Sequence, residues 1–555
     1  MEEIRRSGNY GKSTWDSNYI QRLTTPYGGI EYVEKGEKLK DHVKIMIEGT
    51  ADVLGQLELI DDLQRLDVSH YFEDSVQKLL ERIYADDKDM IEKDLHVTAL
   101  KFRLLRQHGY HVTQEVFSSF TDELGNFKAS LGDDVKGLLS LYEASFLSME
   151  DEPILDSAKD FSTRHLTRKL EQFATHQSLA KQIRHALELP LHWRVPKLQA
   201  NWFIQVYESR PDANLILLEF AKLYFNIAQA SYQNDMKRIS WGHRRSGLGE
   251  KLTFARDRLA ESFLWAVGFT PEPQFGYTRE IMTKVAGMVS VIDDIYDVYG
   301  TLEEIELFTK IIERWDINEL DSLPLYMQIC FLDLNNFVNE LAYHVLKEQG
   351  FNCISNLRKL WIELCQTYII EARWYHSGYY PRTNEYLNNG WISISGPIVL
   401  MYGYFCLTNN INKADVQILE QYPGIVRWPS MVFRLADDFG TSSEEIKRGD
   451  VPKSIQCYMH ETGCCEEDAR VYIRNLIYEL WKKMNKEILL AEKPFKSFGV
   501  TALNLVRMSL CFYLNYGDGF GVNPNSETKN NLVSLIVDPI PIPIPIPIPI
   551  PMPST

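Results

Sequence analysis

Apolar residues recur at helical spacing along most of this chain, and this pattern restricts the fold more than any other feature of the sequence. One representative face is formed by residues Leu59, Ile60, Leu63 and Leu66. Such spacing places apolar side chains on one side of a helix, and that side must be buried against another helix. Alternating apolar and polar runs, which are typical of half-buried strands, are scarce. The sequence therefore predicts an all-α protein.

The length and one break in the pattern predict the domain organisation. A chain of 555 residues is too long for a single hydrophobic core, so at least two domains are expected. A polar stretch with a proline, residues 209–214, interrupts the helical pattern. We therefore expect an N-terminal helical domain over residues 1–212 and a C-terminal domain over residues 213–538. Residues 539–551 alternate proline and isoleucine, and proline cannot donate to a β-ladder. We therefore expect a disordered tail over residues 539–555.

The charge and the composition argue against several kinds of partner. A net charge of −17 disfavours nucleic acid and anionic membrane surfaces. No apolar run approaches the roughly 20 residues that a transmembrane helix needs, so no membrane partner is expected. The eight cysteines all lie in the second half without zinc-finger spacing, and we expect them to be reduced thiols.

Two acidic clusters lie on helical stretches of the second half. The first reads DDIYD and places Asp293 and Asp297 on one helix face. The second starts at Asp437, and Thr441 and Glu445 follow on the same face, four and eight residues on. Carboxylates and hydroxyls are hard oxygen ligands that suit Mg²⁺, which commonly shares the phosphate oxygens of a substrate. We therefore expect metal sites that allow this acidic chain to bind a diphosphate.

These clusters, with several basic residues, resemble the motifs of class I terpene synthases of flowering plants, in particular the b-type subfamily of mostly monoterpene synthases. A further match is the Arg-Arg-x8-Trp motif formed by Arg5, Arg6 and Trp15. The resemblance runs from residue 5 to about residue 540. It implies two helical domains, an N-terminal relict α-barrel and a C-terminal class I terpenoid synthase α-bundle.

The resemblance also implies roles for individual residues. The implied metal ligands are Asp293, Asp294, Asp297, Asp437, Thr441 and Glu445, with Asp294 alternatively paired with a basic residue. The implied substrate-binding residues are Arg256, Arg258, Asp293, Asp297, Arg434, Asp437, Lys447 and Arg448. The implied catalytic residues are Asp293, Asp297, Arg256 and Arg434. The N-terminal strand with Arg5, Arg6 and Trp15 is expected to cover the site as a lid.

Candidate pocket residues are aromatic or small side chains near these motifs: Trp265, Ala286, Val289, Tyr296, Trp391, Ser395, Phe433 and Tyr516. Residues 393–397 match a stretch where a helix of the family breaks, and Gly-Pro gives a physical cause for such a break. Ala286 stands where isoprene synthases are expected to carry Phe. The small side chain leaves room for a substrate of ten carbons or more.

The implied reaction is metal-assisted loss of diphosphate from an allylic prenyl diphosphate. We expect three Mg²⁺ ions with the bound diphosphate, with Mn²⁺ as an alternative. The leading hypothesis is a monoterpene synthase that converts geranyl diphosphate to a ten-carbon olefin or alcohol. The alternatives are a sesquiterpene synthase acting on farnesyl diphosphate, then an isoprene synthase, a chain-elongating prenyltransferase or a non-catalytic scaffold. We expect a monomer or weak homodimer, in the plastid stroma if a presequence has been removed and otherwise in the cytoplasm.

Acidic pairs also occur in the first half, at residues 61–62, 86–87 and 133–134. None forms the D-x-D-D motif with which class II cyclases of this superfamily protonate a double bond. Ionisation is therefore expected to start at the diphosphate, and these pairs are expected to be solvated acids.

Overall fold

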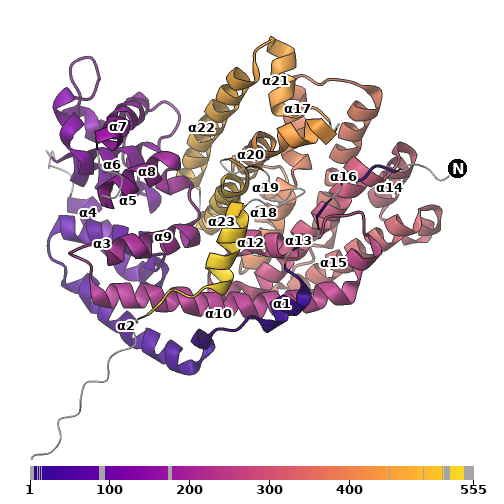
Figure 1. The fold of residues 1–555 in the computed structure, drawn as a ribbon, viewed down its shortest axis with the longest axis horizontal. Coiled ribbons are helices and arrows are strands. Elements are labelled where there is room, and N and C mark those ends of the chain that lie inside the picture. Colours follow the sequence, from indigo (N-terminus) through magenta and orange to yellow (C-terminus); the bar gives the residue numbers. More distant parts are fainter. Residues whose placement is uncertain are drawn as a thin grey trace, which may run out of the picture.

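A computed structural model describes residues 5–8, 10–11, 13, 15–86, 94–172, 178–448, 451–491, 493–514, 517 and 526–542. Helices dominate these residues, and the β-pairing among them is a single isolated bridge between Thr121 and Phe127. The all-α prediction is confirmed. Two helical bodies lie side by side, one from the N-terminal part of the chain and one from the C-terminal part (Figure 1).

The helices of the first body have 6 to 20 residues, and 3-10 turns join several of them. The N-terminal helices are α1 Ser17–Arg22, α2 Ile30–Gly49, α3 Val53–Arg65, α4 Glu73–Asp86, α5 Leu95–Gln107, α6 Val135–Ser145, α7 Pro153–Gln172, α8 Ser178–Glu188 and α9 Pro196–Glu208. Of these, α1 lies apart from the rest, against α10 of the second body (Figure 1).

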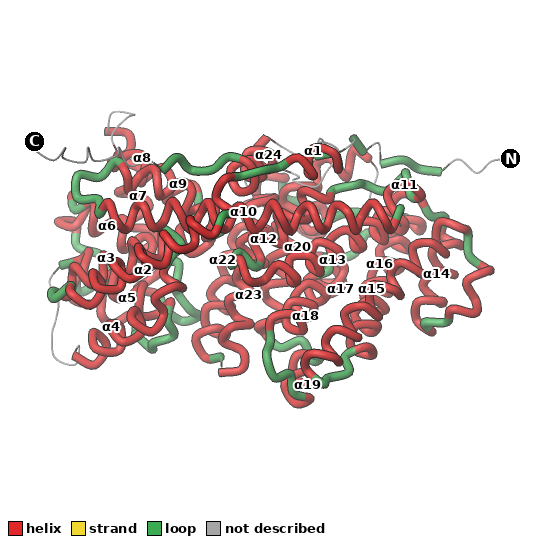
Figure 2. The backbone as a smooth tube through the Cα atoms, turned by 90° about the horizontal axis from the view of Figure 1, so that it is seen from below, coloured by secondary structure: helices red, strands yellow, loops and turns green. Residues whose placement is uncertain are grey.

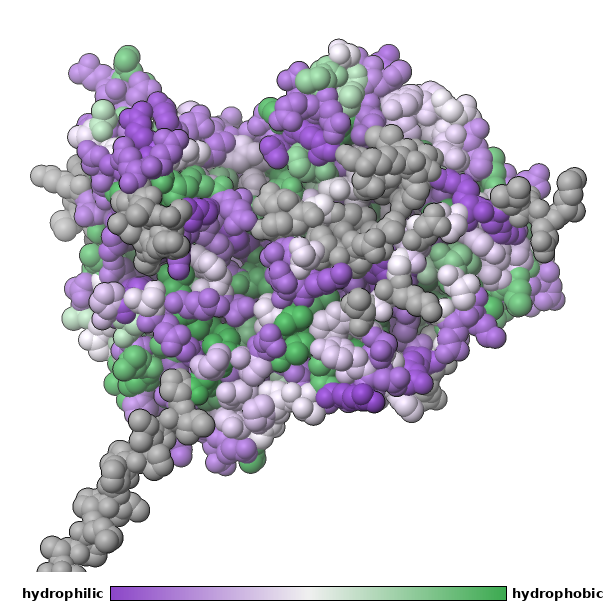
Figure 3. Space-filling view, in the orientation of Figure 1, coloured by the Kyte–Doolittle hydropathy of each residue, from purple (hydrophilic) through white to green (hydrophobic). Residues whose placement is uncertain are grey.

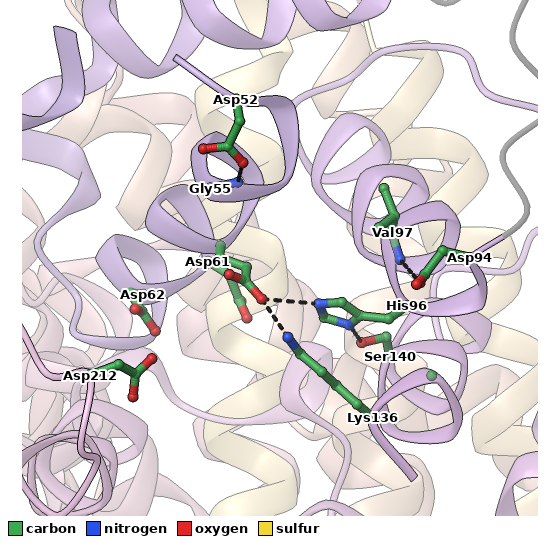
Figure 4. A network of polar contacts seen from close by, with 12 residues as sticks. Asp52, Gly55, Asp61, Asp62, Asp94, His96, Val97, Lys136, Ser140 and Asp212 are labelled. Carbon is green, nitrogen blue, oxygen red and sulfur yellow. Dashed lines mark hydrogen bonds and ion pairs between the residues drawn. The ribbon is translucent and has the colours of Figure 1, made fainter. Parts of the chain in front are cut away.

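Polar side chains fix where these helices begin and how they meet (Figure 4). Asp52 and Asp94 each accept a hydrogen bond from the backbone N–H three residues on, at 2.7 and 3.0 Å, which caps α3 and α5. The imidazole of His96 on α5 bonds to Ser140 of α6 at 2.7 Å and to Glu58 of α3 at 3.3 Å. The three helices therefore share a polar contact at the edge of their apolar core.

The expectation of solvated acids is wrong for residues 61–62. Asp61 accepts from Arg65 at 2.9 Å and also pairs with Arg103 of α5. Asp62 pairs with Arg210 at 2.8 Å, and burial raises the pKa of Asp62 to about 7. Arginines that are distant in sequence surround both carboxylates, and helical spacing alone does not reveal such partners.

The second body contains longer helices. They are α10 Leu215–Ser246, α11 Leu248–Lys251, α12 Leu259–Phe269, α13 Gly276–Asp294, α14 Leu302–Arg314, α15 Leu325–Gln349, α16 Ile354–Ser377, α17 Thr383–Ser393, α18 Gly396–Leu407, α19 Lys413–Leu419, α20 Gly424–Arg448, α21 Ser454–Thr462, α22 Glu466–Leu490, α23 Lys493–Ser509 and α24 Ser526–Leu532. Three π-helical turns follow α13, α23 and α24, at η7 Ile295–Tyr299, η9 Leu510–Leu514 and η10 Val533–Val537.

The long helix α10 runs beneath both bodies (Figures 1 and 2). Its amide side chains also bind the C-terminal segment, because Gln233 donates to the carbonyl of Ile536 at 2.7 Å and Asn226 donates to that of Ile540 at 2.8 Å. The expected tail from residue 539 is thus anchored at its start, and residues 543–555 lie outside the described part. The expected boundary at residue 212 falls just before α10 and stays a prediction.

Two helical stretches, Thr383–Leu407 and Phe495–Leu514, are long and apolar enough to cross a membrane. Neither stretch was expected from the sequence. Most of each stretch is buried against other helices, 78% and 72% of the most apolar window, which is typical of core helices. All eight cysteines are free.

Candidate active site

A cavity of about 140 Å³ opens in the second body, and both acidic clusters face it. Asp293 and Asp297 lie on the wall formed by α13 and η7. Asp437 and Thr441 lie on the wall formed by α20. The structure therefore brings together two motifs that are more than a hundred residues apart in the sequence.

The first cluster lies where α13 changes into the π-helical turn η7. Such turns often occur at functional sites, because the extra residue shifts the direction of the following side chains. Asp293 and Asp297 line the cavity on either side of this change. Their shared face agrees with the predicted spacing.

Asp294 is fully buried and is not among the described residues that line the cavity. Its carboxylate accepts hydrogen bonds from the Tyr10 hydroxyl at 2.7 Å and from the backbone N–H of Arg256 at 2.8 Å. The guanidinium of Arg256 also approaches it, at 3.2 Å. We expected Asp294 either to bind a metal ion or to pair with a basic residue. In the structure it pairs with Arg256.

The second cluster projects from α20, with Asp437 and Thr441 one turn apart and both buried. The Thr441 hydroxyl has no hydrogen-bond partner among the described residues. Gly440 is required between them because a Cβ atom there would lie 2.7 Å from the carbonyl oxygen of Tyr513. The side chains of Glu445, Lys447 and Arg448 lie outside the described part of the chain, so their expected roles stay predictions.

The residues present fit bound Mg²⁺. Two carboxylates on one wall and a carboxylate with a buried, unbonded hydroxyl on the other are oxygen donors of the right kind. Within the described residues, no three His, Cys, Asp or Glu side chains form a group that would hold an ion alone. A donor set of this kind is completed by substrate oxygens or water, as is usual for Mg²⁺.

Two of the expected arginines line the cavity. Arg256 pairs with Asp293, and Arg434 pairs with Asp437 and, at 2.8 Å, with the buried Asp438. These carboxylates raise the pKa of Arg434 well above its ordinary value against the opposing effect of burial, so it stays charged.

Arg258 does not line this cavity. Its guanidinium donates to the backbone carbonyls of Gly11, at 3.0 Å, and Asp257, at 3.1 Å. We expected Arg258 to contact the diphosphate. In this structure its side chain binds the N-terminal arm instead. Arg258 stands immediately before α12, and its bond to Gly11 links this position to the arm.

Five of the expected pocket residues line the cavity: Trp265, Ala286, Val289, Ser395 and Phe433. Tyr296 does not, since its hydroxyl bonds to Thr309 of α14 at 2.8 Å. Tyr296 belongs to the π-helical turn η7, and its ring packs near Phe308 of α14, with centroids 6.1 Å apart. Trp391 packs on Tyr422 instead, with ring centroids 5.4 Å apart. Tyr516 lies outside the described residues.

The break at residues 393–397 is present as expected. α17 ends at Ser393 and α18 begins at Gly396, and Ser395 between them has a φ of 67°. A side chain at Gly396 would lie 2.8 Å from the Cα atom of Ser430. The break therefore depends on a left-handed residue and on close packing against α20.

Several cavity residues were not predicted: Tyr10, Phe269, Tyr368, Glu371, Lys453 and Tyr513. Tyr368 and Glu371 lie on α16, where nothing in the local sequence distinguishes them from core residues. The carboxylate of Glu371 accepts from Asn389 at 2.7 Å and from Ser393 at 2.6 Å. Lys453 is a buried cation just before α21, and its burial could not be read from the sequence.

The N-terminal arm lies over this region. Arg5 forms two hydrogen bonds of 2.7 Å with Glu304 and stacks over the ring of Tyr299 at 4.7 Å. Arg6 donates to the backbone carbonyl of Asp297 at 3.0 Å. Trp15 is buried. The arm therefore contacts the first acidic cluster directly, and its expected role as a lid stays a prediction.

Comparison with known proteins identifies the family. Residues 14–187 match the N-terminal domain of terpene synthases, and residues 244–483 match the metal-binding domain of the terpene synthase family. The chain is 60% identical to a trans-alpha-bergamotene synthase of Phyla dulcis, over 97% of this chain and 99% of that protein. It is 57% identical to an alpha-zingiberene synthase of Ocimum basilicum, with the same coverage. A chloroplastic myrcene synthase of Quercus ilex is 51% identical over 97% of this chain and 90% of its own length.

Solved structures of terpene-forming enzymes have the same fold as this chain. A limonene synthase with 2-fluorolinalyl diphosphate superposes with a TM-score of 0.94 at 46% identity, covering 97% of this chain and all of that one. An isoprene synthase of grey poplar, in complex with three Mg²⁺ ions and dimethylallyl-S-thiolodiphosphate, has a TM-score of 0.86 at 43% identity, covering 95% and 99%. The chain belongs to the terpene synthase family, whose members are lyases acting on prenyl diphosphates.

Proposed function

We propose that this terpene synthase ionises farnesyl diphosphate and converts the cation to a fifteen-carbon olefin. The observation that carries this choice is the 57–60% identity to synthases named for bergamotene and zingiberene, which are sesquiterpenes. The small side chains of Ala286, Ser290 and Ser395 along the cavity wall support it, because they leave depth for a longer chain.

Asp293, Asp297, Asp437 and Thr441, with Glu445, would hold the metal ions. Bound Mg²⁺ supplies Lewis-acid stabilisation of the departing diphosphate. Three ions are supported by the grey poplar isoprene synthase, and Mn²⁺ remains the alternative.

The cationic side chains of Arg256, Arg434 and Lys453 also line the cavity, where they would bind the diphosphate oxygens. Release of the leaving group needs no protein nucleophile. The charge that develops on the diphosphate is met by donors already in place, which lowers the barrier without reorganisation.

The remaining wall would guide the carbocation. Trp265, Phe433 and Tyr368 present aromatic rings to the cavity, and ring faces attract cations. Trp265 and Phe433 contact each other, with centroids 5.0 Å apart, so their orientation is fixed by packing. Glu371 adds a negative charge near the helix break. These groups stabilise the cation while the apolar wall excludes water.

Geranyl diphosphate is the second candidate, and it was the leading hypothesis from the sequence. It is supported by the Arg-Arg-x8-Trp motif and by the relatives named for myrcene and limonene synthesis, at 51% and 47% identity. Those chloroplastic relatives also support a plastid location, whereas use of farnesyl diphosphate favours the cytoplasm. Expression of the full coding sequence fused to a fluorescent protein tests the location.

The experiment that decides the substrate is headspace gas chromatography with mass spectrometry. Purified protein with Mg²⁺ receives geranyl or farnesyl diphosphate in separate vials. A higher kcat/KM with farnesyl diphosphate supports the proposal, and a higher value with geranyl diphosphate replaces it by the second candidate. No product from either substrate, from folded protein, contradicts both.

A further inference from the structure

A second large cavity, of about 460 Å³, lies between the two bodies and is separate from the active site. One side is formed by the first body, at the ends of α3 and α5 and the start of α9. The other side is formed by the end of α22 and by one face of α23. Figure 3 shows a notch between the two lobes of the molecule, and Figure 1 places α22 and α23 beside the first body.

The charge of this cavity is opposite to that of the protein. Five cationic side chains line it: Arg65, Arg106, Arg194, Lys496 and Arg507. The only carboxylate in the described lining is Asp67, which already pairs with Lys197 at 2.7 Å. In a chain with a net charge of −17, such a concentration of cations needs an explanation.

Two of these cations have no carboxylate partner among the described residues. Arg65, Arg106 and Arg194 pair with Asp61, Glu152 and Glu188, whereas Arg507 and Lys496 form no ion pair there. Within the described part of the chain, Arg507 donates only to neutral oxygens, the carbonyl of His192 at 3.0 Å and the side chain of Asn504 at 3.0 Å. Burial without a counter-ion lowers the pKa of Arg507 to about 10.

A neutral side chain of the lining also carries an unbonded donor. Gln199 is 4% exposed, and its amide oxygen bonds to His185 at 2.7 Å. Its amide nitrogen is buried and has no hydrogen-bond partner in the described part of the chain. A buried donor left unbonded costs free energy unless a ligand or water supplies an oxygen.

Part of the wall is apolar. Val500 and Leu503 lie on the face of α23 between Lys496 and Arg507, which are eleven residues apart. This face spans roughly 16 Å at the helical rise per residue, with one cation near each end. The cavity thus offers guanidinium groups suited to phosphate oxygens beside a surface suited to hydrocarbon.

We propose that this interdomain cavity is a second anion site that binds a diphosphate, either inorganic diphosphate or the head of a prenyl diphosphate. The reaction of the family releases the first and consumes the second, so both are present when the enzyme works. Bound between the two bodies, the anion stabilises their packing and supplies the missing counter-charge to Arg507.

The test is isothermal titration calorimetry with inorganic diphosphate in EDTA, which removes the metal on which binding at the active site depends. Binding to the wild type is expected, and Arg507→Gln should weaken it about tenfold or more, the value of a charge-assisted hydrogen bond. Lys496→Gln tests the same cavity at an exposed position, where misfolding is not a concern. No binding, or equal binding by both variants and the wild type, overturns the proposal.

Two controls separate this site from the active site. Arg256→Gln should leave binding in EDTA unchanged, and a loss there would move the binding to the active site and overturn the proposal. Sulfate at matched ionic strength should bind at least tenfold more weakly, and equal binding overturns the specificity for diphosphate. Geranyl S-thiolodiphosphate distinguishes the sources: tighter binding than inorganic diphosphate indicates use of the apolar wall, and equal binding indicates the inorganic anion. Turnover with Mg²⁺, measured in parallel, tests the proposed function independently.

Discussion

The hydroxyl of Tyr10 donates a hydrogen bond of 2.7 Å to the carboxylate of Asp294, a residue 284 positions further along the chain. The guanidinium of Arg256, which also pairs with Asp294, lies over the Tyr10 ring at 5.3 Å from its centroid. The arm, the arginine and the first acidic cluster therefore form one unit. Arm placement and active-site geometry should change together.

Removal of this hydroxyl should lower turnover while the protein stays folded. Tyr10→Phe keeps the ring that lines the cavity and removes one hydrogen bond to a buried carboxylate, a change of about 1.5–3 kcal/mol. We expect kcat to fall by about tenfold or more, with a smaller change in KM. Steady-state kinetics measure both. Tyr19→Phe, at an exposed ring on the nearby helix α1, should be neutral, and equal effects of the two substitutions would contradict the role of Tyr10.

A larger residue at position 286 should shorten the cavity. Ala286→Phe adds an aromatic ring to a lining position, and overpacking of this kind costs about 1–3 kcal/mol. Turnover of farnesyl diphosphate should therefore fall more than turnover of geranyl diphosphate. The ratio of the two kcat/KM values is the measurement. The control is the neighbouring Gly287→Ala, where a Cβ atom would meet no other atom within 4 Å, and a similar shift there would exclude a steric cause.

Replacement of Thr441 by valine should separate metal binding from stability. The hydroxyl is buried without a partner in the described residues, so its removal should leave the melting temperature equal or higher. The concentration of Mg²⁺ for half-maximal activity should rise by at least about tenfold, as is usual when metal-site groups are lost.

The matched control is Thr309→Val. That buried hydroxyl bonds to the carbonyl of Ile305 at 2.7 Å and to Tyr296, so the same substitution should lower the melting temperature. The Mg²⁺ requirement should stay unchanged in this variant. If Thr441→Val destabilises the protein without a change in the Mg²⁺ requirement, its hydroxyl is structural.

Acid should destabilise the protein through His192. Burial, together with the charge of Arg507, lowers the pKa of His192 to about 3, against 6.5 for the unfolded chain. The folded state keeps the imidazole neutral, so stability is present above pH 6.5 and is lost as the pH falls toward 3. The loss at pH 5 amounts to about 2 kcal/mol. Differential scanning calorimetry between pH 7.5 and 5 should show a steeper fall for the wild type than for His192→Gln.

The exposed His460 provides the comparison for this prediction. His460→Gln should leave the pH dependence of the melting temperature as it is in the wild type. Equal slopes for the wild type and His192→Gln would show that another group controls acid stability.

Much of the fold could be predicted because its cause is local. Helical spacing of apolar residues predicted the all-α fold, and the spacing of Asp293, Asp297, Asp437 and Thr441 placed their side chains on shared faces. The break at Ser395 was also expected, since Gly-Pro within a helical run disrupts backbone hydrogen bonding.

Residues whose surroundings depend on distant segments could not be predicted in this way. Tyr368 and Tyr296 are both aromatic residues on helices, yet only Tyr368 lines the cavity, because the packing of α14 and α16 covers the other ring. Arg258 resembles Arg256 in sequence but binds the N-terminal arm. Asp61 was expected to be a solvated acid, but it is held in ion pairs with arginines, among them the distant Arg103.

The sequence by itself determined which residues share a face of each helix, including the oxygen ligands. This is a local property, because side chains on a helix repeat every 3.6 residues. Only the tertiary structure decided which faces meet. The approach of α13 to α20, the arm over Asp297 and the basic cavity between the bodies arise from contacts between residues that are far apart in the chain. Such contacts are fixed by packing and electrostatics across the whole molecule, which no local pattern encodes.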